Sequence, residues 1–356
     1  MKTATKKRVT SILLVTTLLA SLCGCAGETE PSSEKPASEQ PTVQTPQDST
    51  TSAETIEMRL ATSVNETNVM NTAAVHFSEL VAERSDGRIK ITVYPNKQLG
   101  DDAEVIEQMI SGSLDMVEVS GIMFGNYSEL PNAWQLPFLY DDWDHYAEVQ
   151  KSDAAKDILD GMTDIGVQGL AVWTSFFRNV CSAKPVNSYE DCINLKIRTA
   201  ESKMLLDAWA AMGFAPTPMA FGEVYTGLQN GVIDATETDP FGLVSDGFGE
   251  VCKYVFETNH YNWPALLAMN KEKFDALSAE DQAILLECAE ETIDFNIQEC
   301  KDVTDEYVQK SKDAGITYVT PTAEDIQYFR DNVEPVVVKY SELDPRIAAY
   351  VEFARS

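Results

Sequence analysis

The sequence predicts an α/β protein of two lobes crossed by one long helix, and three observations support that prediction. From residue 55 onward, apolar runs that alternate in and out take turns with segments of helical period, an order typical of a largely parallel sheet covered by helices. This body has about 300 residues, which is long for a single hydrophobic core and typical of two lobes. A helical pattern over 278–314 would measure roughly 54 Å, longer than one domain is wide.

The first half of the body is expected to alternate between strands and helices. The expected elements are a strand over 56–61, a helix over 71–83, a strand over 89–94, a helix over 101–111 and a short strand over 115–119. Asp86 and Gly87 form the turn before the second strand. Acidic residues open the second helix, where they suit its positive end.

The second half continues in the same style. Strands are expected over 167–174, 180–183, 195–199 and 232–235, and helices over 202–212, 221–230 and 278–314. Gly213, Gly231 and Gly315 each close a helix, because glycine takes the left-handed cap most easily. Ser278 and Asp281 form a capping box of the S-x-x-D kind at the start of the long helix.

The first 54 residues are expected to target and tether the protein. Four cations precede an apolar run over 12–22, which is too short to span a bilayer as a mature helix and is flanked like a secretory signal. The run closes with Leu22-Cys23-Gly24-Cys25, which resembles the bacterial lipobox. That resemblance implies a signal peptide over 1–24 and a lipid on the sulfur of Cys25. A plain secretion signal with incidental cysteines is the alternative.

Residues 25–54 are expected to form a disordered linker that carries the lipidated cysteine. Prolines recur every five residues at positions 31, 36, 41 and 46 among Ser, Thr, Glu and Gln. Such a segment lacks the apolar surface that would offset its ordering entropy. It therefore reaches from a membrane surface to the globular body.

The chain is strongly acidic. It has 57 Asp and Glu against 27 Lys and Arg, a formal net charge of −30, and loss of the four cations of the signal peptide takes it to about −34. Such a charge repels nucleic acid and anionic lipid. An anionic ligand must therefore be bound by locally concentrated positive charge.

Two arginines are candidates for that positive charge. Arg178 is the only charged residue between Asp164 and Lys184 and lies among aromatic residues, and Arg198 ends a second run with few charges, Leu-Lys-Ile-Arg. A guanidinium does not lose its proton in a protein, so it needs an anion or several acceptors. If no carboxylate of the protein supplies the anion, a small organic acid can.

The sequence shows no catalytic, metal or cofactor motif, so no cofactor or metal is expected and the protein is not expected to be an enzyme. The three histidines are far apart, and no H-E-x-x-H, G-x-S-x-G, P-loop or dinucleotide fingerprint occurs. Residues 141–144 lack the glycine and the terminal glutamate of a calcium loop and indicate a helix N-terminus. Five cysteines follow residue 25 without C-x-x-C spacing, which predicts buried free thiols, with a Cys181–Cys192 bond left open.

Short motifs follow one another along residues 56–340 in a recognisable order. They are Gly-Arg-Ile at 87–89, Tyr-Pro-Asn-Lys-Gln-Leu-Gly at 94–100, Ser-Leu-Asp-Met at 113–116, Leu-Pro-Phe-Leu at 136–139, Leu-Lys-Ile-Arg at 195–198, Pro-Thr-Pro-Met at 216–219 and a long block over 223–234. In this order they resemble the solute-binding proteins of tripartite ATP-independent periplasmic (TRAP) transporters, DctP family. The resemblance implies a periplasmic-binding-protein fold of the type II kind. Lobe I would comprise 55–176 and 264–303, and lobe II 177–263 and 304–356.

The resemblance also implies roles for residues of lobe II. Arg198 corresponds to the arginine that forms a bidentate salt bridge with the ligand carboxylate, with a structural salt bridge as the alternative. Arg178 corresponds to a second arginine, which either binds the same anion or braces the hinge. Phe221 corresponds to an aromatic residue that packs on the ligand or fills the core. Thr238 stands where an asparagine often binds the carboxylate, so that part of the clamp is altered.

In lobe I, the resemblance points to two acids. Asp102 matches a pocket acid of the family, and Glu66 lies on the loop after the first strand, which usually lines the cleft. Ser120 and Met123 stand near the positions of the acid and the arginine that mark sialate binders, so sialate is not expected. A sugar acid, or a hydroxy or keto acid, is expected as the ligand.

The implied function is capture of a small carboxylate by lobe closure outside the cytoplasm and its delivery to TRAP permease subunits. The protein would reach the membrane through its lipid anchor and would bind no nucleic acid. A ligand-presenting sensor subunit of a signalling receptor and an extracellular enzyme acting on organic acids are the alternatives.

Overall fold

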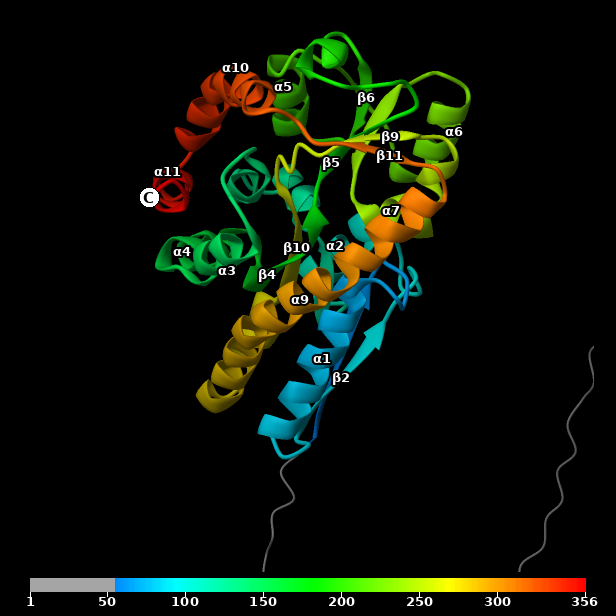
Figure 1. Cartoon of the computed structure of the whole chain (residues 1–356). Helices are drawn as coiled ribbons and strands as arrows, with labels where there is room; N and C mark the ends of the chain where they lie inside the picture. Colours follow the sequence, from blue (N-terminus) through cyan, green and yellow to red (C-terminus); the bar gives the residue numbers. More distant parts are fainter. Residues whose placement is uncertain (1–54) are drawn as a thin grey trace, which may run out of the picture. The chain divides into compact units, whose positions relative to one another are not determined.

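Two β-sheets and the helices packed on them make up residues 55–356, the part of the chain that the computed structural model describes (Figure 1). The α/β class expected from the alternation of strands and helices is confirmed. The signal peptide, Cys25 and the linker over 25–54 lie outside the described residues.

The first sheet has the strand order β2-β1-β3-β10-β4. Its strands are β1 (Ile56–Thr62), β2 (Ile89–Tyr94), β3 (Met116–Ser120), β4 (Val167–Phe177) and β10 (Asn262–Asn270). The three N-terminal strands run parallel to one another, as expected, but β10 runs antiparallel to both β3 and β4. The expectation of a largely parallel sheet is therefore confirmed for the strands on which it was based, and β10 is the antiparallel exception, since β4 runs in the same direction as β3. Strand β10 is buried along almost its whole length, so its sequence has no alternation that would have marked it as a strand.

The second sheet has the order β11-β9-β5-β8-β6-β7. Its strands are β5 (Asn179–Ser182), β6 (Lys196–Thr199), β7 (Ala215–Pro218), β8 (Ala235–Thr238), β9 (Tyr254–Phe256) and β11 (Thr317–Val319). The strand expected over 232–235 begins only at Ala235. The reason is local: the amides of Val232 and Ile233 both donate back to the carbonyl of Gly227 and so complete the end of the preceding helix.

The helices cover the faces and ends of these sheets (Figure 1). They are α1 (Val69–Arg84), α2 (Asp102–Ile110), α3 (Trp143–Lys151), α4 (Asp153–Gly161), α5 (Lys203–Ala211), α6 (Val224–Gln229), α7 (Pro240–Ser245), α8 (Lys271–Asp275), α9 (Ala279–Asp313), α10 (Ala323–Ser341) and α11 (Pro345–Ala354). Asp142 caps α3 through the amide of His145, which confirms a helix N-terminus at this acidic stretch. Within residues 55–356, none of these helices has the length and the apolar character that a membrane span requires.

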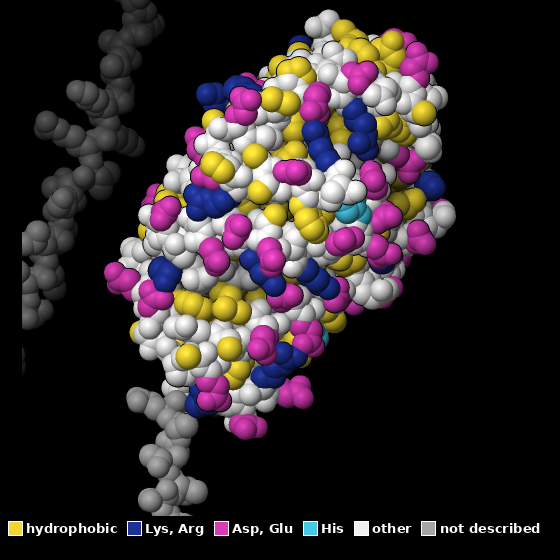
Figure 2. All heavy atoms as spheres, turned by 90° about the vertical axis from the view of Figure 1, so that its left-hand side faces the viewer, with side chains coloured by type: hydrophobic (Ala, Val, Ile, Leu, Met, Phe, Trp, Pro, Cys, Tyr) yellow, Lys and Arg dark blue, Asp and Glu magenta, His cyan; other side chains and the backbone are white. Residues whose placement is uncertain are grey.

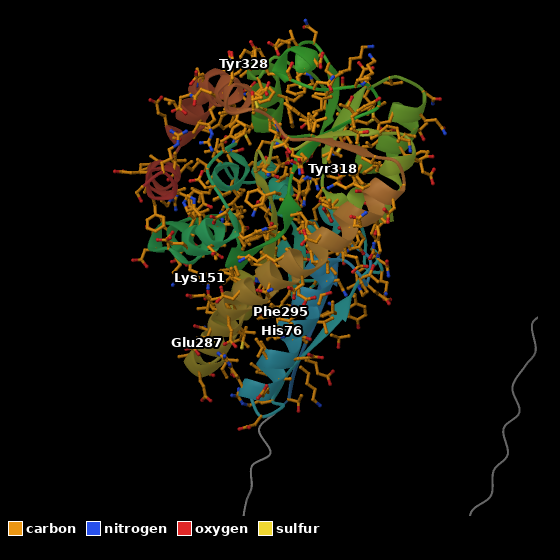
Figure 3. All side chains as sticks on the ribbon, in the orientation of Figure 1. His76, Lys151, Glu287, Phe295, Tyr318 and Tyr328 are labelled. Carbon is orange, nitrogen blue, oxygen red and sulfur yellow. The ribbon has the colours of Figure 1, made fainter. Side chains whose placement is uncertain are left out.

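Helix α9 is the long helix that the sequence predicts. The hydroxyl of Ser278 accepts from the amide of Asp281 at 3.1 Å and so starts it, and Gly315 follows its end with a φ of +83°. The helix packs on α1 and β4 of the first sheet and, further along, on α7 of the second. The rings of His76 in α1 and Phe295 in α9 stack at 3.7 Å (Figure 3). The expected crossing of both halves is therefore confirmed.

The chain passes between the two sheets three times. The crossings from β4 to β5 and from β9 to β10 are adjacent, and the third runs from β10 through α8 and α9 to β11. At the first crossing, the amide of Arg178 donates to the carbonyl of Tyr261 at 2.8 Å, and the amide of His260 donates to the carbonyl of Arg178 at 3.2 Å. The lobe boundaries expected after residues 176 and 263 fall beside these crossings and stay a prediction.

The described cysteines and the surface agree with the composition of the chain. The free thiols that the sequence predicts are all buried, and they are Cys181, Cys192, Cys252, Cys288 and Cys300.

On the face seen in Figure 2, acidic side chains are spread widely, with Lys and Arg between them. This distribution suits a solvated, soluble surface.

Candidate functional site

Arg178 lies between β4 and β5 and is surrounded by carboxylates. Its Nε donates to Glu237 Oε2 at 2.5 Å, one terminal nitrogen pairs with Asp239, and the other donates to the carbonyl of Glu237 at 3.0 Å. Its guanidinium carbon lies 4.8 Å from the ring centroid of Trp263. Burial lowers the pKa of Arg178, but Glu237 and Asp239 raise it by more, so the net shift is upward. Two protein acids therefore already balance this charge.

Arg198 lies near the carboxyl end of β6, and its environment is different. It is only 5% exposed, and its Nε donates to the carbonyl of Met219 at 3.0 Å. Among residues 55–356 no carboxylate lies within ion-pair distance of it. Burial is the main cause that lowers the pKa of Arg198, the charge of Arg178 lowers it further, and Glu237 partly opposes both. A buried guanidinium without a counter-ion is costly, so this position favours an anion.

Phe221 is brought next to Arg198. It opens a short 3₁₀ turn over Phe221–Glu223 just before α6, and the Arg198 guanidinium carbon lies 5.9 Å from the centroid of its ring. The ring packs edge-on against Phe248 at 5.6 Å. It is nevertheless 52% exposed, which is unusual for a phenylalanine that only fills a core.

Thr238 ends β8 between the two acids that bind Arg178. It is buried, and its hydroxyl faces Gly242 in α7 so closely that a Cβ at Gly242 would collide with it. Asp239 caps α7 by accepting from the amide of Gly242 at 2.8 Å. Arg178, Arg198, Phe221 and Thr238 therefore surround the carboxyl ends of β6 and β8, the end of a parallel pair at which ligands usually bind.

A second polar cluster lies in the first sheet, and one member is a residue that the sequence analysis did not single out. Glu118 lies in β3 with its side chain fully buried, and its Oε2 accepts from the hydroxyl of Thr62 at 2.7 Å. Burial raises the pKa of Glu118 to about 8, against the effect of the Thr62 bond and with a contribution from the charge of Asp102. Glu118 therefore holds its proton at neutral pH.

Asp102 is the first residue of α2 and lies beside this buried acid. Burial raises its pKa, while the Ser63 hydroxyl, the charge of Lys97 and the backbone of Ser120 act in the opposite direction. Glu66 is not part of this cluster. It lies in the turn before α1 with an exposed side chain that forms no hydrogen bond or ion pair with the described residues, and its carbonyl accepts from Asn71.

The register of β10 connects the two clusters. Glu118 and Ser120 lie opposite Leu267 and Ala265, and opposite residues of an antiparallel pair share one face of the sheet. Trp263 is two residues beyond Ala265 on the same strand, about 7 Å further along that face. Because Arg178 lies over Trp263, the face that carries Glu118 and Ser120 continues toward the arginine cluster.

Sequence patterns indicate Arg178 and Arg198 as members of one site but do not identify Glu237, Asp239, Glu118 or Trp263. Two signals were present. Glu237 and Asp239 are two apart around a strand end, so their side chains lie on one face. Glu118 is the one charged residue in a five-residue strand that is otherwise apolar or small. Within residues 55–356, no group of His, Cys, Asp and Glu is arranged to hold a metal ion.

Known proteins resemble this chain over most of its length. A family model described as bacterial extracellular solute-binding protein, family 7 (DctP), matches residues 60–343. The 2,3-diketo-L-gulonate-binding periplasmic protein YiaO of Escherichia coli (strain K12) is 32% identical over 274 residues, which cover 76% of this chain and 83% of that protein. The C4-dicarboxylate-binding periplasmic protein DctP of Rhodobacter capsulatus is 30% identical over 299 residues, with 83% and 89% covered. The crystal structure of a TRAP periplasmic solute-binding protein from Xanthobacter autotrophicus Py2 with bound β-D-galacturonate matches with a TM-score of 0.77 at 26% identity, covering 84% of this chain and 99% of that one.

Proposed function

The chain belongs to the TRAP-transporter solute-binding proteins of the DctP family, and from that premise we propose that it captures a sugar acid, or a hydroxy or keto acid, and delivers it to a membrane permease. As a member of this family it is an extracytoplasmic solute-binding protein. The ligand class, the contact residues and the membrane anchor are parts of the proposal.

The observation that carries the proposal is the contrast between the two arginines. Arg178 is paired with Glu237 and Asp239, whereas Arg198 is also buried and has only the carbonyl of Met219 as an acceptor among residues 55–356. A ligand carboxylate that binds the terminal nitrogens of Arg198 would supply the missing anion in the bidentate geometry that guanidinium groups favour. Arg178 would then hold Glu237 and Thr238 in place beside it.

The remaining residues fit the body of a sugar acid. Phe221 offers an exposed ring beside Arg198 for the apolar face of the ligand, and Asp102 offers a carboxylate for its hydroxyl groups. A relative binds 2,3-diketo-L-gulonate and a similar structure contains β-D-galacturonate, both acids of this class. Glu66 would take part only after movement of the turn that carries it.

Capture would proceed by closure of the two sheets on each other. The paired crossings at Arg178 and Tyr261, together with α9, are the connections about which such a motion would occur. Closure would exclude water and so strengthen the charge-assisted bonds to Arg198. The protein would make and break no bond of its ligand.

Delivery to a permease would require the protein to stay close to a membrane. A lipid on Cys25 and the linker over 25–54 would provide that attachment. The surplus of acidic residues makes electrostatic adsorption to anionic lipid or to nucleic acid unfavourable, so the anchor would act alone.

A thermal-shift screen tests the proposal. The purified protein is heated with sugar acids, hydroxy acids, keto acids and dicarboxylates, and mass spectrometry identifies any compound that co-purifies. At least one acid is expected to raise the melting temperature, because a ligand that binds only the folded state stabilises it. The same compound should be recovered unchanged. If no carboxylate raises the melting temperature, or if the recovered compound is converted, the proposal is wrong.

A further inference from the structure

Three enclosed oxygens near the carboxyl ends of β1 and β3 have no hydrogen-bond partner among residues 55–356. They are Oε1 of Glu118, Oδ1 of Asp102 and Oγ of Ser120. Glu118 is fully buried and Ser120 is 7% exposed. Buried polar atoms are nearly always paired in native proteins, so several orphans in one place need an explanation.

The three residues belong to one cluster. Thr62 and Glu118 are paired across β1 and β3, and Ser120 lies two residues beyond Glu118 on the same face of β3. Helix α2, which begins with Asp102, packs on β3, and the charge of Asp102 acts on Glu118. The face continues along β10 to Trp263, beneath Arg178.

The chemistry of the cluster determines what it can bind. Ionised carboxylate oxygens only accept hydrogen bonds, whereas a hydroxyl and a protonated carboxyl group can also donate. Burial keeps the proton on Glu118 at neutral pH and also raises the pKa of Asp102, so the cluster presents the carboxyl group of Asp102 together with the hydroxyls of Ser63 and Ser120. A ligand hydroxyl can donate to Asp102 and accept from Ser120. A ligand carboxylate would supply only acceptors and would bring another acid beside the carboxyl group of Asp102.

The charges of the arginine cluster lead to the same conclusion. Glu237 and Asp239 both pair with Arg178, so the two carboxylates and the guanidinium groups of Arg178 and Arg198 sum to zero formal charge although Arg198 has no ion pair of its own. Arg198 can bind one ligand carboxylate there, but no further positive charge remains for a second. Near the cluster, Lys97 is a cation whose charge acts on Asp102, but it is exposed and forms no ion pair with the described acids, so solvent screens its effect on a second carboxylate.

We propose that Asp102 and Glu118, with Ser120, select a ligand that has one carboxylate and an uncharged, hydroxyl-bearing far end, and that they reject an acid with a second carboxylate at that end. The inference rests on the proposed function, because it assumes that Arg198 binds the first carboxylate. It distinguishes an aldonic or uronic acid from the dicarboxylate named for one relative.

Isothermal titration calorimetry with matched acids tests this inference. Each pair has the same carbon chain and configuration and differs only in the far end, such as D-gluconate with D-glucarate, or D-erythronate and L-threonate with the corresponding tartrates. Uronates and succinate complete the set. The proteins are the wild type, Asp102→Asn, Glu118→Gln, Ser120→Ala and, as a matched control, Glu107→Gln, which removes an exposed acid from the same helix. Circular dichroism and thermal melting confirm that each variant folds.

The wild type is expected to bind the one-carboxylate member of a pair roughly a hundredfold more tightly, because like charges brought together in an interface cost several kcal/mol. Asp102→Asn should reduce that ratio by about tenfold or more, since an amide can donate to the second carboxylate. Ser120→Ala, which keeps the charges, should weaken the one-carboxylate acid without favouring the diacid. Glu118→Gln mimics the protonated group and should keep the preference at pH 7, and Glu107→Gln should match the wild type.

The outcomes separate this inference from the proposed function. If neither member of any pair binds, the proposed function is wrong and the inference falls with it. If a diacid binds as tightly as its one-carboxylate partner, the inference alone is wrong. It is also wrong if the preference is present but Asp102→Asn and Ser120→Ala both behave like Glu107→Gln, since the orphan oxygens would then bind only structural water.

Discussion

The Nε of Arg178 donates to Oε2 of Glu237 at 2.5 Å, although the two residues are 59 positions apart in the chain. The side chain of Glu237 is completely buried, and Asp239 completes the enclosure of the guanidinium. This pairing distinguishes Arg178 from Arg198 and leads to opposite predictions for the two arginines.

Replacing Arg178 by alanine should destabilise the protein by about 3–5 kcal/mol, because it leaves two buried carboxylates without a partner. Urea-induced unfolding at pH 7 measures this loss. Adding Glu237→Gln to the variant should recover a large part of the lost free energy of unfolding. If Arg178→Ala unfolds at the same urea concentration as the wild type, the pairing is not structural.

Replacing Arg198 by alanine should leave the unliganded fold intact or make it slightly more stable, since Arg198 has no carboxylate partner among residues 55–356. The same change should abolish the rise in melting temperature that the ligand produces. Differential scanning fluorimetry measures both effects. Arg355→Ala, which removes an exposed arginine paired with Glu334, is the control and should keep the full ligand response. An undiminished response in Arg198→Ala would exclude Arg198 as the anchor.

Glu118 should make the protein less stable as the pH rises. Its pKa is about 8 in the folded protein and close to the ordinary glutamate value of 4.5 in the unfolded chain, so the folded state holds more protons between these values. The contribution of Glu118 to the free energy of unfolding is then fully present below about pH 4.5. It falls by up to about 1.4 kcal/mol per pH unit as the pH rises to 8.

The comparison with Glu118→Gln isolates this effect, because glutamine does not titrate. Denaturant unfolding of both proteins from pH 5 to pH 9 should show the wild type losing stability relative to the variant by a few kcal/mol. A constant difference across this range would contradict a proton on buried Glu118.

Replacing Gly242 by alanine should destabilise the protein by about 1–3 kcal/mol, because the new Cβ would collide with the hydroxyl of Thr238. In a Thr238→Ala background the cost should largely disappear, and a double-mutant cycle on the free energy of unfolding measures this coupling. Gly222→Ala is the control, since its Cβ would meet no atom within 4 Å. Equal costs in both backgrounds would show that Thr238 does not restrict this turn.

Replacing Cys25 by serine should move the protein from the membrane fraction to the soluble fraction of its bacterial host, because the lipid would have no sulfur to attach to. Cell fractionation and incorporation of labelled fatty acid measure the change. Cys23→Ser should keep the lipid. Label retained in Cys25→Ser would place the attachment elsewhere.

The sequence by itself determined the features that depend on neighbours in the chain. The helices and strands of residues 56–120 follow from local periodicity, and α9 follows from an apolar stripe with Ser278 at its start and Gly315 after its end. The ordered motifs led to the family and to Arg198, because each motif is a short continuous segment. The strand expected over 232–235 begins only at Ala235, because the amides of Val232 and Ile233 donate to the carbonyl of Gly227 at the end of the preceding helix. A residue pattern does not contain this detail.

Tertiary structure alone decided the features that join distant segments. The antiparallel insertion of β10 between β3 and β4, the pairing of Arg178 with Glu237, and the enclosure of Glu118 by Thr62 connect residues separated by 56 positions or more. Their physical origin is burial: a charge in an apolar interior must find a partner or lose its ionisation, and the partner depends on which strands the fold places side by side. Arg178 finds its carboxylates in this way. Glu118 has no ion pair with a cationic side chain among residues 55–356, and it retains its proton.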